Sequence, residues 1–496
     1  MKKTSYGTLL SAGDLSGYIS CHHLTHLNLA VTDGRLDAAN YRDPLLAVLQ
    51  ERGLEFETGY LRRLEAEGWN VVLPELGMDE LSVQRTREAM EQGAEVIYQA
   101  SLRSDPWQGR ADFLIKVYKP SRLGDWSYEV FDAKLARETR AGTILQLCLY
   151  AELLADIQGV VPEYVHVITP EEDFTQHSYR SDDFMAYFRL IRAKVLAIVA
   201  KHEVPIPTYP DPCAHCGICG WWSYCDRQRR SDDHLSLVAG LSGAQAVELR
   251  RWDIRTLTAL AGMPLPLPFK PSRGAIETFI RLREQARVQL AGRTAGKPGY
   301  ELLDIAEGKG LSSLPEPSPG DLFFDMEGDP FIGSAGMEYL FGWVTNDEPV
   351  TTRQLWALNP EQEKAAFEAF VDEVTQRCFY FPDMHIYHFS PYEPSALKRL
   401  MGRYATREDE VDTLLRAGRF VDLHTITRQA IRAGVESYSL KELEQLHDFE
   451  REFELRAAAA QLREMERRLE RNDIAGIAAE TKAAIEQYNY EDCRST

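Results

Sequence analysis

Two stretches of this chain place charged side chains on segments that otherwise have the composition of buried strands. Asp132 and Lys134 stand two residues apart in the first stretch, and Asp325 and Glu327 stand two residues apart in the second. On a β-strand such pairs point to the same face. Burying these groups on an apolar strand is unfavourable unless they act together. Because the two stretches are far apart in the sequence, the chain is predicted to contain two α/β units, each with a polar site.

The size and composition agree with a protein of several globular domains. The chain has 496 residues, 44% of them hydrophobic and 27% charged, which is typical of soluble proteins with about two to four domains. The formal net charge of −20 argues against a surface coated with basic groups for DNA. It does not exclude a nuclease, since metal-dependent nucleases gather carboxylates. No apolar run approaches bilayer length, so we expect a cytoplasmic protein without a membrane partner.

Five side chains on three predicted elements extend the first polar site. They are Asp112 on a strand at 109–118, Asp132 and Lys134 at the end of a strand at 127–133, and Gln146 and Tyr150 on a helix at 141–155. Residues four apart share one face of a helix. Carboxylates in such a group can hold Mg²⁺ or Mn²⁺, which polarises a phosphate and lowers the pKa of a bound water. A lysine beside the metal can offset charge on the phosphate, so the pattern indicates phosphodiester hydrolysis.

The order and spacing of these elements resemble the RecB-family nucleases of the PD-(D/E)xK class. The resemblance implies a restriction-endonuclease-like fold. It assigns the first metal aspartate to Asp112, the acid-x-lysine strand to Asp132 and Lys134, and the family's Gln-x-x-x-Tyr helix to Gln146 and Tyr150. Each pattern alone is common on protein surfaces. Together, and in this order, they indicate a DNA-cutting domain.

One position departs from the family. Many RecB-type nucleases carry a histidine metal ligand on the preceding helix, for which we predict residues 57–67. Phe56 occupies the matching position here. We expect Glu57 to serve as the ligand instead, and the alternative is a site that holds metal weakly. The departure bears on activity more than on fold.

A cluster of four cysteines follows the first unit. Cys213, Cys216, Cys219 and Cys225 fall within thirteen residues. Since no secretion signal is evident, such a cluster indicates metal ligands rather than disulfides. The local residues alone favour a structural Zn²⁺ held by these four thiols, with His215 as a further candidate.

The RecB resemblance favours a different ligand set. RecB-branch nucleases with an iron–sulfur cluster take one cysteine from upstream of the nuclease core and three from a downstream triple. The resemblance therefore implies a structural [4Fe–4S] cluster on Cys21, Cys216, Cys219 and Cys225. In that interpretation Cys213 is spare. The cluster would join the two ends of the domain across a long loop of chain.

The second polar site pairs a strand with a distant helix. Asp325 and Glu327 end a strand predicted at 322–326, and Tyr488 and Asp492 stand four apart on a predicted helix. This arrangement is similar to the tyrosine variant of the DEDD exonucleases, which have an RNase H-like fold. The resemblance implies that Asp325, Glu327, Tyr488 and Asp492 form the site and that two metal ions activate a water there.

The middle acid of that motif is not clear from the sequence. Glu393 stands where the family has an aspartate, after a predicted strand at 385–388, and Asp422 is another candidate. Glutamate can bind Mg²⁺ with a longer arm. The alternative is an RNase H-like domain that has lost catalysis and is retained for its architecture.

Four regions are predicted along the chain. They are a RecB-like domain with the cysteine cluster at 1–235, a helical region at 236–306, a linker at 307–320 and an RNase H-like domain at 321–496. The helical region resembles a helix-hairpin-helix, with a plain spacer as the alternative. The stretch Ser11-Ala12-Gly13-Asp14 resembles a capping box and predicts a helix that runs from there through Cys21. Residues 451–487 are expected to form a long exposed helix or a helical pair. We expect the last domain to be truncated at Thr496.

This order of domains resembles a family of predicted bacterial RecB-like nucleases that often continue into a superfamily 1 helicase. No phosphate-binding loop is present in the chain itself. The resemblance implies a metal-dependent nuclease acting on DNA single strands or ends, in repair or defence, with a helicase region in the same longer chain as partner. The alternatives are an inactive nucleic-acid-binding scaffold and an RNA exonuclease that uses the Asp325 site.

Overall fold

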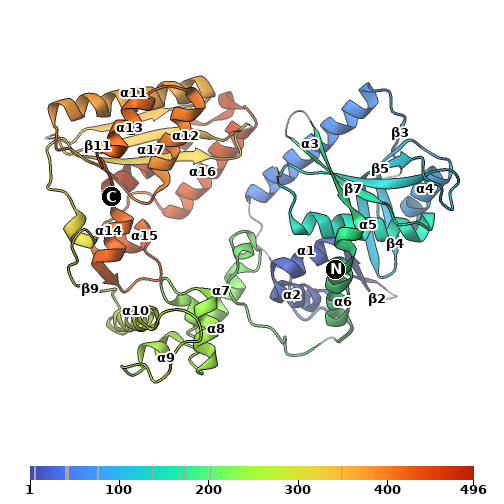
Figure 1. Ribbon diagram of the computed structural model, residues 1–496, viewed down its shortest axis with the longest axis horizontal. Helices are drawn as coiled ribbons and strands as arrows, with labels where there is room; N and C mark the ends of the chain where they lie inside the picture. Colours follow the sequence, from blue (N-terminus) through green and yellow to red (C-terminus); the bar gives the residue numbers. More distant parts are fainter. Residues whose placement is uncertain are drawn as a thin grey trace. The chain divides into compact units, whose positions relative to one another are not determined.

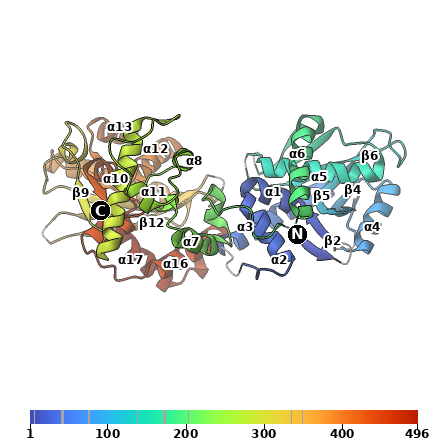
Figure 2. The same cartoon turned by 90° about the horizontal axis from the view of Figure 1, so that it is seen from below.

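The computed structural model describes residues 1–4, 7–39, 44–74, 77–136, 138–170, 174–201, 203–333, 335–347 and 349–496. The chain divides into two compact units, Met1–Gln228 (unit 1) and Arg229–Thr496 (unit 2); both are drawn in Figures 1 and 2. The architecture is mixed α/β in both. Among the described residues, none of the helices combines the length and apolar character of a membrane span.

Unit 1 is built on a mixed sheet. Its described strands are β1 (Lys2–Thr4), β2 (Gly7–Ser11), β3 (Val71–Val72), β4 (Val96–Ser104), β5 (Trp107–Val117), β6 (Ser127–Ala133), β7 (Tyr164–Thr169) and β8 (Thr175–Arg180). The main path runs β1-β2-β5-β6-β7-β8, with β4 also pairing with β5 and β3 with β4. β5 is antiparallel to both β4 and β6, and β6 is parallel to β7. This pairing puts Asp112 and Asp132 on adjacent strands.

Helices lie on both faces of this sheet. The described helices of unit 1 are α1 (Ala12–Ser20), α2 (His22–Thr32), α3 (Pro44–Ala66), α4 (Glu80–Glu91), α5 (Ala141–Gln158), α6 (Ser181–Lys201) and the 3₁₀ turn η1 (Ala214–Ile218), and α7 (Trp222–Ser231) crosses the boundary with unit 2. Leu147 and Leu154 of α5 belong to the larger apolar core. Tyr60 and Leu64 of α3 pack with Phe113 in a separate apolar cluster. The sheet is thus enclosed between α5 and α3 (Figure 1).

The first helix differs from its prediction at one residue. Ser11 and Asp14 form the predicted capping box. The predicted helix through Cys21 is wrong there, because α1 ends at Ser20 and Cys21 has extended backbone angles. Cys21 therefore begins α2 rather than lying inside a helix.

Unit 2 is built on a smaller sheet with β10 at its centre. The described strands are β10 (Leu322–Asp329), β11 (Met337–Thr345), β12 (Thr352–Trp356), β13 (Ile386–His388) and β14 (Phe420–Asp422), in the order β12-β11-β10-β13-β14. β10 and β11 are antiparallel, whereas β10, β13 and β14 are parallel. The sequence reasoning did not predict β11, β12 or β14.

Helices enclose the unit 2 sheet as well. They are α11 (Pro360–Tyr380), α12 (Tyr392–Tyr404), α13 (Glu408–Arg416), α14 (Leu423–Ala430), α15 (Leu440–Leu443), the turns η4 (Glu444–Leu446) and η5 (Ile474–Gly476), α16 (Leu455–Glu470) and α17 (Ala479–Ser495). Phe324 of β10 packs with Phe367 of α11 and Leu397 of α12 in the main core. α16 and α17 are the predicted helical pair. They are not simply exposed, since Met465 and Ile485 are fully buried.

A small helical group begins unit 2. It comprises η2 (Leu235–Leu237), α8 (Gly243–Arg251), α9 (Leu257–Ala261) and α10 (Ile276–Ala295), followed by β9 (Tyr300–Leu302) and η3 (Gly310–Ser313). Leu249, Leu260 and Phe279 share one apolar core. The expectation of a wholly helical stretch to residue 306 is wrong at β9, which pairs with β15 (Ile431–Ala433).

Candidate metal centres

Asp132 is the most buried member of the unit 1 centre. Its side chain is fully inaccessible at the end of β6, and its Oδ2 lies 2.7 Å from Lys134 Nζ. The Gln146 amide on α5 donates to Asp132 Oδ1 at 3.1 Å. The aspartate is thus held by one cation and one amide, which keeps a carboxylate in a position that burial alone would disfavour.

Asp112 lies beside it on β5. Its Oδ2 accepts a hydrogen bond from the backbone N–H of Ala133 at 3.0 Å. Burial, and then the charge of Asp132, raise the pKa of Asp112 well above its usual range. Burial opposes the charge of Lys134, but Asp132 and Asp112 outweigh it and raise the pKa of the ammonium. One lysine does not neutralise two adjacent carboxylates, so the site is suited to a divalent cation.

Glu57 reaches the same centre from α3. The Gln99 amide of β4 donates to Glu57 Oε1. Gln99 has a φ of 55°, and it falls between the ladder pairs that Tyr98 and Ala100 form. This local kink aims the amide at Glu57. The sequence reasoning missed Gln99, because a polar residue within an apolar segment carries no sign of its backbone conformation.

Phe56 packs in an apolar cluster of unit 1. Its ring stacks on Phe174 with a centroid distance of 5.0 Å. The side chain at the position where the family has a histidine therefore belongs to that cluster.

Tyr150 closes the centre from α5. A Cβ atom on Gly109 would lie 2.1 Å from Tyr150 Cε1, so the ring rests directly over the glycine of β5. Burial, and then the charge of Asp132, raise the pKa of the Tyr150 hydroxyl far above its usual value. The glycine that precedes Asp112 in the motif thus makes room for the tyrosine of the helix.

The cysteines gather at the start of α2. The Sγ atoms of Cys213 and Cys216 lie 3.9 Å apart. After burial, the charges of Cys216 and Cys21 raise the pKa of the Cys213 thiol to about 11. Cys219 has Cys216 and Cys21 as neighbours as well. Cys213, which the iron–sulfur interpretation leaves spare, therefore lies among the predicted ligands.

Cys225 lies in an apolar cluster with Leu27 and Trp221. The Trp221 indole N–H donates to Asn28 of α2 at 3.4 Å. The chain that follows α6 thus packs against the helix that Cys21 begins. Among the described residues, no three cysteine sulfurs lie within 4.8 Å of one another.

The unit 2 centre is the tightest carboxylate group in the described part of the chain. Asp325, Glu327 and Asp492 each place a ligand oxygen within 4.8 Å of the others. Asp325 and Glu327 alternate along β10 with the core residues Phe324 and Met326. Burial, and then Asp492, raise the pKa of Glu327 to about 8. Burial, and then Glu327, raise the pKa of Asp325 well above its usual range.

Two cations that the sequence reasoning missed hold Asp492. Lys441 Nζ lies 2.6 Å from Asp492 Oδ2, and Arg451 Nη2 lies 2.5 Å from Asp492 Oδ1. The Tyr488 ring lies beneath both, with its centroid 4.9 Å from the ammonium and 5.6 Å from the guanidinium carbon. The only sequence signal is that Lys441 and Arg451 precede the last helix.

Asn489 fixes the orientation of Asp325. Its amide donates to Asp325 Oδ2 at 2.9 Å, and its side chain is fully buried. A Cβ atom on Gly342 of β11 would lie 1.6 Å from Asn489 Oδ1. The asparagine therefore occupies space that only a glycine leaves open.

The two candidate middle acids differ in their surroundings. Glu393 is buried at the start of α12, its Oε2 lies 3.4 Å from His388 Nδ1, and its charge contributes to the raised pKa of Asp325. Asp422 instead caps α14: its carboxylate accepts hydrogen bonds from the backbone of His424 and the hydroxyl of Thr425. Glu393 is thus close to the centre, whereas Asp422 has a structural role.

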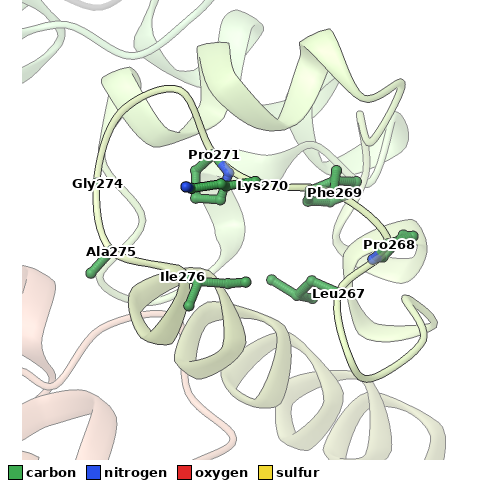
Figure 3. Close-up of a pocket in the computed structure, with 8 residues that line it drawn as sticks. All are labelled: Leu267, Pro268, Phe269, Lys270, Pro271, Gly274, Ala275 and Ile276. Carbon is green, nitrogen blue, oxygen red and sulfur yellow. The ribbon is translucent and has the colours of Figure 1, made fainter.

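A hollow on the helical group of unit 2 is unrelated to these centres. It has a volume of about 570 Å³ and is lined by residues 267–271 and 274–276, in the loop before α10 and at the first residue of that helix (Figure 3). Lys270 is the one charged side chain among the eight that line it. Apolar walls with a single charge do not provide hydrolytic chemistry.

Comparison with known families places unit 2 in a class. Residues 322–496 match the model of the RNase_H superfamily. The match spans all five strands of the unit 2 sheet and ends with α17, so it contains Asp325, Glu327 and Asp492. This part of the chain is an RNase H-like domain, a nuclease-type fold that commonly uses divalent metal ions to hydrolyse phosphodiester bonds. No curated protein matches the chain.

Proposed function

We propose that this chain is a metal-dependent nuclease with two hydrolytic centres. The observation that carries the proposal is the group of Asp325, Glu327 and Asp492, with oxygens within 4.8 Å of one another, on an RNase H-like domain. Three hard oxygen donors in a partly buried site fit Mg²⁺ or Mn²⁺.

In unit 2, Asp325, Glu327 and Asp492 would hold the metal, with Glu393 close to Asp325. A bound ion lowers the pKa of a water and polarises the scissile phosphate. Lys441, which pairs with Asp492, would turn to a phosphate oxygen when Asp492 serves as a metal ligand, and its charge would stabilise the phosphate. The hydroxyl of Tyr488, whose ring lies under the two cations, would orient the attacking water.

In unit 1, Glu57, Asp112 and Asp132 would hold the second centre's metal, and Lys134 would stabilise charge on the phosphate. Adjacent carboxylates on β5 and β6 and the Gln146 contact support a restriction-endonuclease-like domain of the RecB branch. The substrate we propose is DNA, cut at single strands or ends. We further propose that the chain is the nuclease part of a nuclease–helicase that works in the cytoplasm.

The cysteines would hold a structural cluster rather than a catalytic ion. We propose a [4Fe–4S] cluster on Cys21, Cys216, Cys219 and Cys225, with a zinc site as the alternative. The packing of the Trp221 segment against α2 supports a link between Cys21 and the downstream cysteines. The 3.9 Å contact between Cys213 and Cys216 makes Cys213 the competing fourth ligand. Iron and zinc content of anaerobically purified Cys21→Ala and Cys213→Ala variants decides between the two.

The experiment that tests the function is cleavage of end-labelled single-stranded DNA and RNA with Mn²⁺. Wild type is compared with Lys134→Ala, with Asp325→Asn and with the double variant. We expect each single variant to lose one activity and the double variant to lose both. Cleavage that persists in the double variant would refute both centres. RNA cleavage that only Asp325→Asn removes would assign RNA to the RNase H-like domain.

A further inference from the structure

A bulge lies next to the unit 2 centre. Glu327 pairs with Leu340, whereas Gly328 pairs with Glu338, so Tyr339 is an extra residue on β11. The Tyr339 side chain is fully buried, and its hydroxyl has no hydrogen-bond partner in the described part of the chain. Buried hydroxyls almost always have a partner. The hydroxyl beside the bulge is therefore available to a ligand.

A second unsatisfied oxygen lies at the end of β10. Asp329 is 5% exposed. Its Oδ1 accepts a hydrogen bond from the backbone N–H of Phe331 at 2.8 Å, while its Oδ2 has no hydrogen-bond partner among the described residues. A buried carboxylate requires a proton, a cation or hydrogen-bond donors.

Helix α16 brings a further carboxylate to this place. Met465 and Leu469 pack with Met337 and Tyr339 in one apolar cluster, and Met337 is the ladder partner of Asp329. Glu466, next to Met465, therefore lies on the helix that packs against this end of β11.

The charges agree with that packing. Burial, and then Asp329 and Glu470, raise the pKa of Glu466 to about 7. Burial, and then Glu327, Glu466 and Asp329, raise the pKa of the Tyr339 hydroxyl far above its usual value. Three carboxylates are thus near enough for their charges to raise the pKa of this hydroxyl.

We propose that Asp329, Glu466 and the Tyr339 hydroxyl form a separate divalent-cation site that fastens α16 to the sheet beside Glu327. The donors are all oxygens, which suits Mg²⁺, Mn²⁺ or Ca²⁺. Among the described residues, the carboxylate oxygens of Glu327, Asp329 and Glu466 do not all lie within 4.8 Å of one another, as those of the catalytic group do. The glutamate has three rotatable bonds with which to close on the ion. The site uses neither Asp325 nor Asp492, and it does not depend on the nuclease proposal.

The test counts bound Mn²⁺ by electron paramagnetic resonance on the full chain. The background variant Asp112→Asn, Asp325→Asn, Asp492→Asn disables both proposed catalytic centres. We expect it to retain one Mn²⁺ per chain, with a dissociation constant of about 10⁻⁴ M for so few ligands. Adding Asp329→Asn or Glu466→Gln should weaken this binding at least about tenfold.

The matched control is Glu464→Gln on the same helix. Its carboxylate already pairs with Arg467 and Arg468, so binding should not change. Mn²⁺ should also raise the melting temperature of the background variant, and the rise should disappear with Glu466→Gln. The proposal is wrong if the folded background binds no Mn²⁺ at about 1 mM, or if Glu464→Gln weakens binding as much as Glu466→Gln.

Discussion

In the unit 1 centre, three carboxylates lie near one cation, Lys134; they belong to Glu57, Asp112 and Asp132. In the unit 2 centre, Asp492 pairs with two cations, Lys441 and Arg451. In unit 1 the cation directly follows the strand that carries the acid. In unit 2 the cations come from segments well before the last helix. A cation two residues from its acid has a fixed relation to it, while cations from separate segments can be exchanged for a metal. The unit 1 centre therefore depends on its one lysine, whereas in the unit 2 centre two cations share that role.

The largest difference is expected between the two lysines. Lys134→Ala, measured with unit 2 disabled by Asp325→Asn, should lower the single-turnover rate about 10²–10³-fold. Lys441→Ala, measured with unit 1 disabled by Lys134→Ala, should lower its rate only about tenfold, because Arg451 still faces Asp492. Equal losses would mean that the second cation contributes nothing.

Lys441→Met should also tighten Mn²⁺ binding to unit 2, because an ammonium no longer competes for Asp492. A purely structural lysine would instead weaken it. A higher Mn²⁺ affinity together with a lower rate is thus expected only if Lys441 pairs with Asp492 without metal and with the phosphate when metal is bound.

Each centre has its own strand glycine that a helical side chain covers, which allows a matched stability test. Gly342→Ala would collide with Asn489, and Gly109→Ala would collide with Tyr150. We expect each to lower the free energy of unfolding by about 1–3 kcal/mol, measured by urea denaturation. Gly402→Ala on α12 is the control, since its Cβ would meet nothing within 4 Å. Gly342→Ala should additionally weaken Mn²⁺ binding, because Asn489 orients Asp325.

The pH dependence should be stronger in unit 2. The pKa of Glu327 is raised from 4.5 to about 8, so in metal-free protein the folded state binds more protons than the unfolded state in that range. Stability without metal should therefore fall as pH rises from about 4.5 to about 8. Mn²⁺ should reverse the trend by taking the place of the proton. Melting temperatures with EDTA and with Mn²⁺ test this; Glu327→Gln should flatten the EDTA curve, and an unchanged slope would contradict the assignment.

The sequence was sufficient for the parts of the fold that have short-range signals. The strand with Asp325 and Glu327 and the spacing of Tyr488 and Asp492 resemble the DEDD exonucleases. That resemblance implied an RNase H-like domain, and the family match at residues 322–496 confirms that part. The sequence did not reveal the cations that pair with Asp492. Lys441 and Arg451 meet Asp492 only through tertiary packing. Nothing in the local sequence distinguishes them from the many surface cations of an acidic chain.

Unit 1 shows the same limit in its backbone. The strand that carries Gln99 was not predicted at all, and the role of Gln99 depends on a φ of 55°. Cys21 was expected within a helix but lies at a break between two. Both features are set by how distant segments pack, because a single extended or left-handed residue has a weak signature in one sequence.

The smallest expected effect concerns the residue that departs from the RecB pattern. Phe56 stacks on Phe174, with the ring centroids 5.0 Å apart, so Phe56→His should place an imidazole in the apolar cluster and not at the metal. We expect a loss of about 1 kcal/mol in stability and less than a twofold change in Mn²⁺ affinity of unit 1. Glu57→Gln is the partner variant, and it should weaken that affinity because Glu57 adjoins Asp112. If Phe56→His tightened Mn²⁺ binding about tenfold while Glu57→Gln had no effect, α3 would present position 56 to the site. Position 56, where the family has its histidine, would then be able to supply a metal ligand in unit 1. Glu57 would not be the residue that takes the place of that histidine.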